Sequence, residues 1–124
     1  MQESKQTPVA FEGAMSQLPT PPDTFVEFCR RFPQLAEAWK LVGQATAKGP
    51  LDEKTGRLIK LAVSIGNLRE GAVHSAVRKA MVSGVTREEI DQVVALAAST
   101  LGFPATVAVF SWIRDEVEKS EPEA

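Results

Sequence analysis

Residues 69–90 read REGAVHSAVRKAMVSGVTREEI, and this stretch decides the fold. In its first half, apolar side chains recur at intervals of three and four residues, which predicts one helix with a buried stripe. Gly84 is expected to end that helix, and Thr86 with Glu89 forms a capping box that begins the next one. The stretch therefore predicts two consecutive helices joined by a short turn.

The same helical period runs through most of the chain, whereas the alternating pattern of a strand is scarce. Asp23, Pro33 and Asp52 are placed to begin three earlier helices, because Asp caps a helix and Pro suits its first turn. The segment GFP, residues 102–104, ends one later helix and begins the last. Six helices with short connections predict an all-α, six-helix bundle. The residues expected to face inward are Phe25, Phe28, Cys29, Phe32, Leu35, Ala38, Trp39, Val42, Thr55, Leu58, Ala62, Ile65, Val73, Ala76, Val77, Ala80, Met81, Ile90, Val93, Val94, Ala97, Leu101, Thr106, Val109, Phe110, Ile113 and Val117.

Length and composition are those of one ordinary globular domain. The chain has 124 residues, of which 44% are hydrophobic and 24% are charged. Residues 1–20 are polar and run into a proline-rich segment, so we expect an N-terminal arm there. Residues 21–118 are expected to form a single all-α domain, followed by a frayed tail at 119–124.

Charge and residue counts exclude several classes of function. A net charge of −2 provides no basic surface for nucleic acid. One cysteine and one histidine exclude an intrachain disulfide and a conventional zinc site, so no metal is expected. Residues 1–15 lack the segments of a secretory signal, and no apolar run is long enough to span a bilayer. We therefore expect a cytoplasmic protein that does not contact a membrane.

The last two predicted helices suggest self-association. They hold the small-residue segments ALAAST and ATVAV, which permit close approach of helix backbones, and Trp112 follows an almost unbroken apolar run from Phe103. A helix that is apolar on more than one side needs a second partner. These features predict a homo-oligomer, with a tightly packed monomer as the alternative.

Three segments of the chain, LDEKTGRLIKLAVS, REGAVHSAVRKAMVSGVTREEI and LAASTLGFPATVA, lie between Leu51 and Val117. In this order and spacing they resemble the carboxymuconolactone decarboxylase and alkylhydroperoxidase-D-like family. The resemblance implies the alkylhydroperoxidase-D-like fold, assembled into trimers or hexamers with active sites near subunit contacts.

The same resemblance shows that the residues of the peroxidase branch are absent. That branch carries Cys-x-x-Cys at positions that fall here on Arg69 and Ala72, a histidine at Ala76 and a glutamate at Arg57. Peroxide reduction by a dithiol needs a reactive thiolate and a resolving thiol, and neither is present there. Cys29 lies outside the matched segment, so a peroxidase that uses Cys29 or a partner's thiols is the weakest of our hypotheses.

The lactone decarboxylase branch of the family is nearer, because it also reads REG at this place. It carries its histidine at the position of Ala76, however, whereas this chain has His74 two residues earlier. Two residues correspond to about 200° around a helix. His74 therefore does not share the direction of the family's histidine.

Glu70 and His74 are the candidate catalytic pair, because residues four apart are neighbours on a helix face. Arg78 continues their row, and either Arg78 or Arg69 could bind the carboxylate of a small anionic substrate while Glu70 and His74 exchange a proton. We expect the pair to face a water-accessible pocket. The structural alternative is a glutamate that complements the helix dipole beside a half-buried histidine.

Arg57 is the next candidate for binding an anion, because it replaces the family's glutamate with a cation. On the predicted helix it shares a row with Leu61, Ser64 and Leu68, away from the main apolar stripe. The alternative is a solvated arginine on an outward face.

These observations predict a divergent carboxymuconolactone-decarboxylase-like protein that acts without a cofactor on a small organic acid or lactone. Decarboxylation or enol–keto proton transfer needs only an acid, a base and an anchor for the developing charge. The alternative is a non-catalytic oligomeric binding or scaffold protein of the same fold.

Overall fold

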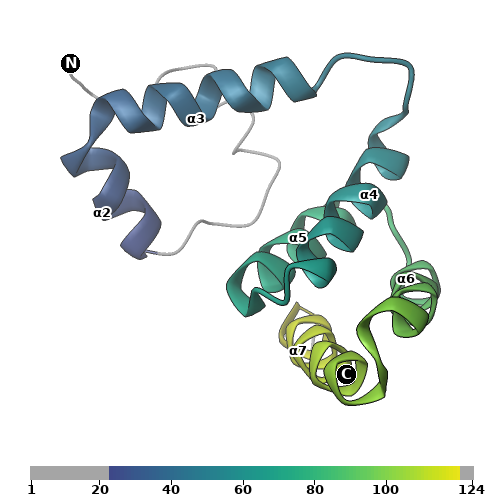
Figure 1. Ribbon diagram of the computed structural model, residues 1–124. Helices are drawn as coiled ribbons and strands as arrows, with labels where there is room; N and C mark the ends of the chain where they lie inside the picture. The colour runs from purple at the N-terminus through teal and green to yellow at the C-terminus, as the bar shows by residue number, and fades with distance from the viewer. Residues whose placement is uncertain (1–22, 121–124) are drawn as a thin grey trace. The chain divides into compact units, whose positions relative to one another are not determined.

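The computed structural model describes residues 23–120, and every element in this range is a helix (Figure 1). The all-α class predicted from the sequence is thus confirmed. The residues of the predicted N-terminal arm and residues 121–124 lie outside the described range. The chain divides after Pro50 into two compact units. The helices are α2 (Asp23–Arg31), α3 (Pro33–Thr46), α4 (Glu53–Gly66), α5 (Glu70–Val82), α6 (Arg87–Leu101) and α7 (Phe103–Ser120).

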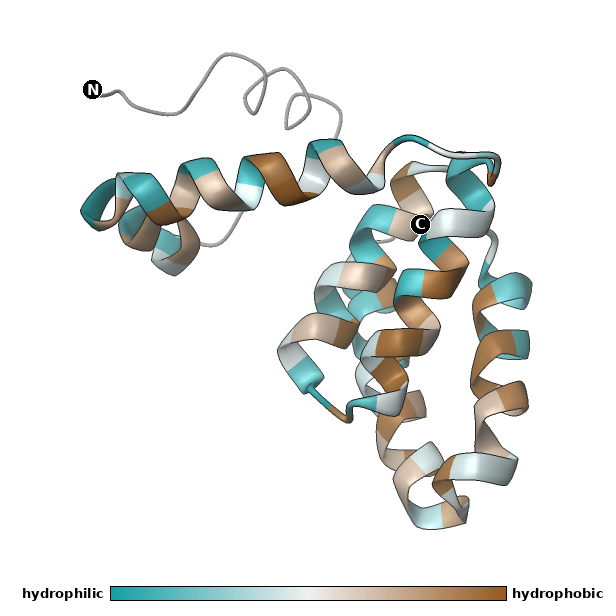
Figure 2. Cartoon of the chain, turned by 45° about the horizontal axis from the view of Figure 1, so that its top comes forward, coloured by the Kyte–Doolittle hydropathy of each residue, from teal (hydrophilic) through white to brown (hydrophobic). Residues whose placement is uncertain are grey.

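The first unit consists of α2 and α3, which meet at Phe32. Pro33 occupies the first turn of α3, as predicted, and the Phe28 and Phe32 rings lie 5.0 Å apart between centroids. The predicted inward stripes are not buried within this unit: neither helix has a buried residue, and Trp39 is 52% exposed. Hydrophobic and hydrophilic turns alternate along α3 (Figure 2). Two helices alone do not enclose an apolar core.

The helices of the second unit begin and end at residues that are suited to helix termini. The Thr55 backbone N–H donates to the Asp52 carboxylate over 2.8 Å, which caps α4 as predicted. The predicted capping box of α6 is also present, with Thr86 and Glu89 each accepting from the other's backbone N–H. Gly102 separates α6 from α7 with a φ of +87°, a conformation that favours glycine.

The four helices of the second unit pack in a closed ring: α4 contacts α5 and α6, and α7 contacts the same two helices. Figure 1 shows α4 beside α5, with α7 below them and α6 at the side. Burial of apolar surface between these helices is the main stabilising contribution. The buried core residues are Leu61, Ile65, Val73, Val77, Ala80, Val85, Ile90, Val94, Val109, Ile113 and Val117.

Leu61, Ala62, Phe110 and Cys29 also differ from their predicted burial. In α4 it is Leu61 that is fully buried, whereas Ala62 is exposed, because this helix turns its Leu61–Ile65 face towards α5 and α6. Phe110 of α7 is 39% exposed rather than inward. Cys29 is partly exposed rather than buried. Within residues 23–120 no helix has the length and apolar character needed to cross a membrane.

Candidate functional site

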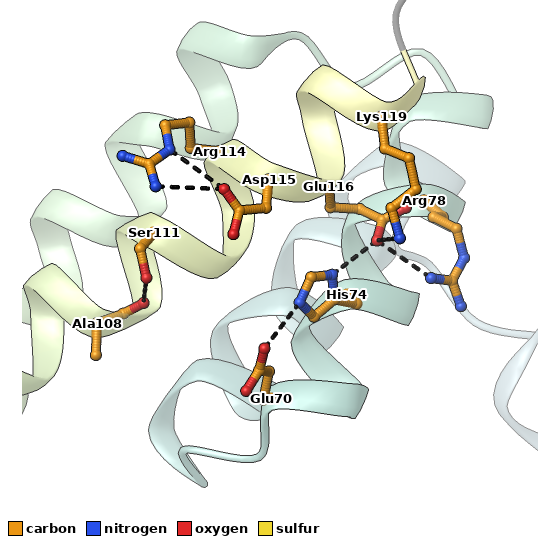
Figure 3. Close-up of polar contacts among 9 residues, drawn as sticks. All are labelled: Glu70, His74, Arg78, Ala108, Ser111, Arg114, Asp115, Glu116 and Lys119. Atoms are coloured by element: carbon orange, nitrogen blue, oxygen red, sulfur yellow. Dashed lines mark hydrogen bonds and ion pairs between the residues drawn. The ribbon is translucent and has the colours of Figure 1, made fainter.

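One row of polar side chains runs along α5 on the flank that faces α7 (Figure 3). Glu70, His74 and Arg78 are spaced four residues apart, so they lie one above another on the helix. Glu70 Oε2 lies 3.3 Å from His74 Nε2. The structure therefore brings together the predicted acid, the predicted imidazole and one predicted arginine.

A fourth member of this cluster, Glu116 of α7, was missed by the sequence analysis. Its side chain is 2% exposed, and Oε1 lies 2.7 Å from His74 Nδ1. The same oxygen lies 3.3 Å from Nη1 of Arg78 and 4.0 Å from Nζ of Lys119. Glu116 follows Ile113 by three residues, so the helical period could have placed it on the buried face. A buried carboxylate needs hydrogen-bonding and charged partners, and these contacts provide them.

The carboxylates of Glu116 and Glu70 contact the two nitrogens of the His74 imidazole, Nδ1 and Nε2 respectively. Glu116 is buried, whereas the side chain of Glu70 is 59% exposed and that of His74 is 18% exposed. A proton on the Nε2 side can therefore be exchanged with Glu70 and with water, while the Nδ1 side is closed by protein. This asymmetry is suited to general acid–base chemistry at Nε2.

Arg57 lies on the other flank of α5, where α4 packs. Its Nε donates to Ser83 Oγ over 3.3 Å, and that hydroxyl donates to Glu53 Oε2 over 2.7 Å. Ser83 is nine residues beyond His74, which corresponds to about 180° around a helix. Arg57 is thus half-buried rather than on an outward face, and it does not share a site with Glu70 and His74.

Arg69 immediately precedes α5 at the N-cap position. Its side chain makes no capping hydrogen bond, and it is exposed. Within residues 23–120 it has neither an ion pair nor a hydrogen-bonded side-chain partner. Its guanidinium is therefore available to an external anion next to Glu70.

A comparison with family models matches residues 33–115 to the carboxymuconolactone decarboxylase family. The chain belongs to the carboxymuconolactone decarboxylase family. The match includes α3 to α6 and most of α7, and it ends one residue before Glu116. Comparisons with curated proteins and with solved structures gave no match.

The redox positions that the family resemblance implies fall on α4, at the N-cap of α5 and on α5 in the present chain. Arg57, Arg69, Ala72 and Ala76 occupy those positions, and none of them carries a thiol or an imidazole. Cys29 lies on α2 in the other unit, where burial raises the pKa of its thiol. A raised pKa disfavours the thiolate that peroxide reduction requires. Within the described residues no group of three or more His, Cys, Asp or Glu is arranged to hold a metal ion.

Lys79, which the sequence analysis did not consider, lies half-buried on α5. The pKa of its ammonium group is lowered, and burial is the largest cause. Repulsion from Arg57, Lys60 and Arg78 lowers this pKa further. None of the described carboxylates forms an ion pair with it. The charged form of Lys79 therefore opposes folding.

Replacing Lys79 by methionine should raise the free energy of unfolding at neutral pH by about 0.5 kcal/mol, because it removes like-charge repulsion and keeps the aliphatic stem. The pKa of Lys79 is lowered from 10.5 in the folded chain, so its destabilising effect is full at neutral pH. That destabilising effect disappears as the pH rises to the pKa of Lys79 in the unfolded chain. Urea unfolding at neutral and alkaline pH measures the difference, with the exposed Lys48→Met as the control. A less stable Lys79→Met protein at neutral pH would contradict the prediction.

Proposed function

We propose that the protein catalyses cofactor-free proton transfer, including decarboxylation, on a small organic acid or lactone, with His74 and Glu70 as the acid–base pair. One observation carries this proposal: the imidazole lies between two carboxylates, 3.3 Å from one that is exposed and 2.7 Å from one that is buried. Membership of the carboxymuconolactone decarboxylase family supports the same class of chemistry.

The proposed reaction uses His74 Nε2 as the group that moves the proton. In decarboxylation, the bond to the leaving carboxylate breaks and its electron pair forms an enolate, whose carbon then takes a proton from the imidazolium. In enol–keto transfer, the hydroxyl proton leaves and the same carbon gains one. Glu70 restores the protonation state of the imidazole, because it contacts both Nε2 and water.

Arg69 is the proposed anchor for the substrate's carboxylate, because it is exposed beside Glu70 and has no partner among the described residues. Arg78 is less free to bind an external anion, since it already pairs with Glu116. Arg57 is not part of this proposed site, because it lies on the α4 flank.

The proposal includes assembly into a homo-oligomer, with a trimer or hexamer as the expected form. Exposed apolar side chains in the second unit support it, among them Leu96 and Phe103, which are 69% and 78% exposed. Side chains of this kind can be buried in contacts between protein subunits. A cytoplasmic location also remains part of the proposal.

Turnover in D2O tests the reaction class directly. Small β-oxo acids and carboxylated lactones are incubated with the protein, and NMR spectroscopy follows carbon dioxide release and deuterium incorporation at the carbon next to the carbonyl. Incorporation that is faster than the protein-free rate is expected. Uncatalysed rates across both substrate classes would refute the proposal.

Glu70→Gln should lower the rate of this turnover about 10- to 100-fold, because the amide cannot exchange a proton with Nε2. Glu88→Gln is the matched control, since Glu88 is also an exposed acid in the first turn of its helix. It removes the same favourable interaction with a helix dipole and leaves His74 untouched. Equal rates in the Glu70 and Glu88 variants would exclude Glu70 from the chemistry.

A further inference from the structure

We infer that Glu116 is the positioning residue of the site: it accepts the Nδ1 proton of His74 and so presents Nε2 as the reacting nitrogen. This inference rests on the proposed function and assigns a role to a residue on another helix. Figure 3 shows Glu116 of α7 pointing at the ring of His74 on α5, with Glu70 at the opposite end of the ring.

The geometry of the contact favours a fixed hydrogen bond. Oε1 of Glu116 lies 2.7 Å from Nδ1, which is at the short end of the range for N–H···O bonds and is typical of a charged acceptor. The Glu116 side chain is 2% exposed, so water does not compete for this oxygen. Its neighbours in the buried face of α7, Ile113 and Val117, hold the helix against the core. The carboxylate therefore has little freedom to leave the ring.

Nearby cations balance the buried charge of Glu116. Arg78 Nη1 lies 3.3 Å from Oε1, and Nζ of Lys119 lies 4.0 Å from the same oxygen. A buried carboxylate without such partners would strongly destabilise the fold. Arg78 thus stabilises the group that orients His74, which is a role different from binding substrate.

The hydrogen bond at Nδ1 determines the state of the other ring nitrogen. In a neutral imidazole one nitrogen carries the proton, and the bond made by one nitrogen sets the role of the other. With Nδ1–H bonded to Glu116, the neutral ring has its free electron pair at Nε2, which accepts a hydrogen bond from Glu70 when that carboxyl carries a proton, or from water. Nε2 is then the base that removes the substrate's proton, and a substrate approaches from the side of Glu70.

Nitrogen NMR tests this assignment in the full-length protein. His74 is the only histidine in the chain, so both imidazole nitrogen signals have a single source. At a pH where the ring is neutral, the wild-type protein should show the proton on Nδ1. Glu116→Leu should abolish this preference and lower kcat at least about tenfold. Glu116→Gln keeps an acceptor oxygen, so it should retain the Nδ1–H form and more activity than Glu116→Leu.

A second variant covers the case in which Glu116→Leu fails to fold because Arg78 loses its partner. Glu116→Leu/Arg78→Met removes both charges, a replacement that buried ion pairs often tolerate. It should show the same change of tautomer and the same loss of kcat. A wild-type ring protonated at Nε2 alone, or a tautomer unchanged in the leucine variants, would overturn the inference.

The kinetics separate the failure of this inference from that of the proposed function. If His74→Gln abolishes turnover but Glu116→Leu and Glu116→Leu/Arg78→Met both retain it, only the role assigned to Glu116 is overturned. Absence of turnover in the wild-type protein would overturn the proposed function, and with it the role of Glu116 in the reaction.

Discussion

Replacing His74 by glutamine should lower turnover by a factor of about 10²–10⁴, which is the usual contribution of a positioned general acid–base group. Glutamine is close in size and can still bond to Glu116, but it cannot take up and release a proton near neutral pH. The variant should therefore lose kcat while its far-ultraviolet circular dichroism stays unchanged. Steady-state kinetics on a substrate identified in D2O measure the loss.

The control for this variant is Glu118→Gln, an exposed change on α7 two residues beyond Glu116. It should leave turnover within about twofold of wild type, as expected for an exposed residue that makes no contact with the cluster. Retention of more than a tenth of wild-type kcat in a folded His74→Gln protein would remove His74 from the mechanism. A loss of helical content would instead assign His74 a structural role through its contact with Glu116.

The sequence predicted the part of the site that depends on a single helix. Glu70, His74 and Arg78 form a row because residues four apart are neighbours on any α-helix. Glu116 is 42 residues from His74, and only the packing of α7 against α5 brings the two together. Its helical spacing from Ile113 indicated burial, but its charge argues against burial unless partners are known. Contacts between helices therefore determine this site as much as the local pattern does.

In the fold, too, features within one helix were predicted from the sequence, whereas features that depend on packing between helices were not. The caps at Asp52 and Thr86 were predicted because each involves backbone groups within three residues. The predicted face of α4 was wrong at Leu61 and Ala62, because these residues together with Leu58 and Ile65 cover a wide apolar arc. Several rotations of such a helix bury similar apolar area. Its packing against α5 and α6 selects the rotation that buries Leu61 and places Arg57 on the α5 side.

Leu61→Ala should consequently lower the free energy of unfolding by about 3 kcal/mol. Leu61 is fully buried in the core of the second unit, so truncation removes apolar contacts and leaves a cavity that the packed helices only partly fill. A loss of this size is a large fraction of the stability of a small protein. Urea unfolding followed by circular dichroism measures it as a lower midpoint with a similar slope.

Leu51→Ala is the matched control, because it removes the same atoms from a position just before α4 that is 61% exposed and lies outside the helices proposed to self-associate. It should cost less than about 1 kcal/mol, since little apolar surface is returned to water. The alternative rotation of α4, with Ala62 inward and Leu61 outward, predicts a small cost for Leu61→Ala as well. A Leu61→Ala protein as stable as Leu51→Ala would therefore contradict the observed packing of α4, and with it the placement of Arg57 beside Ser83.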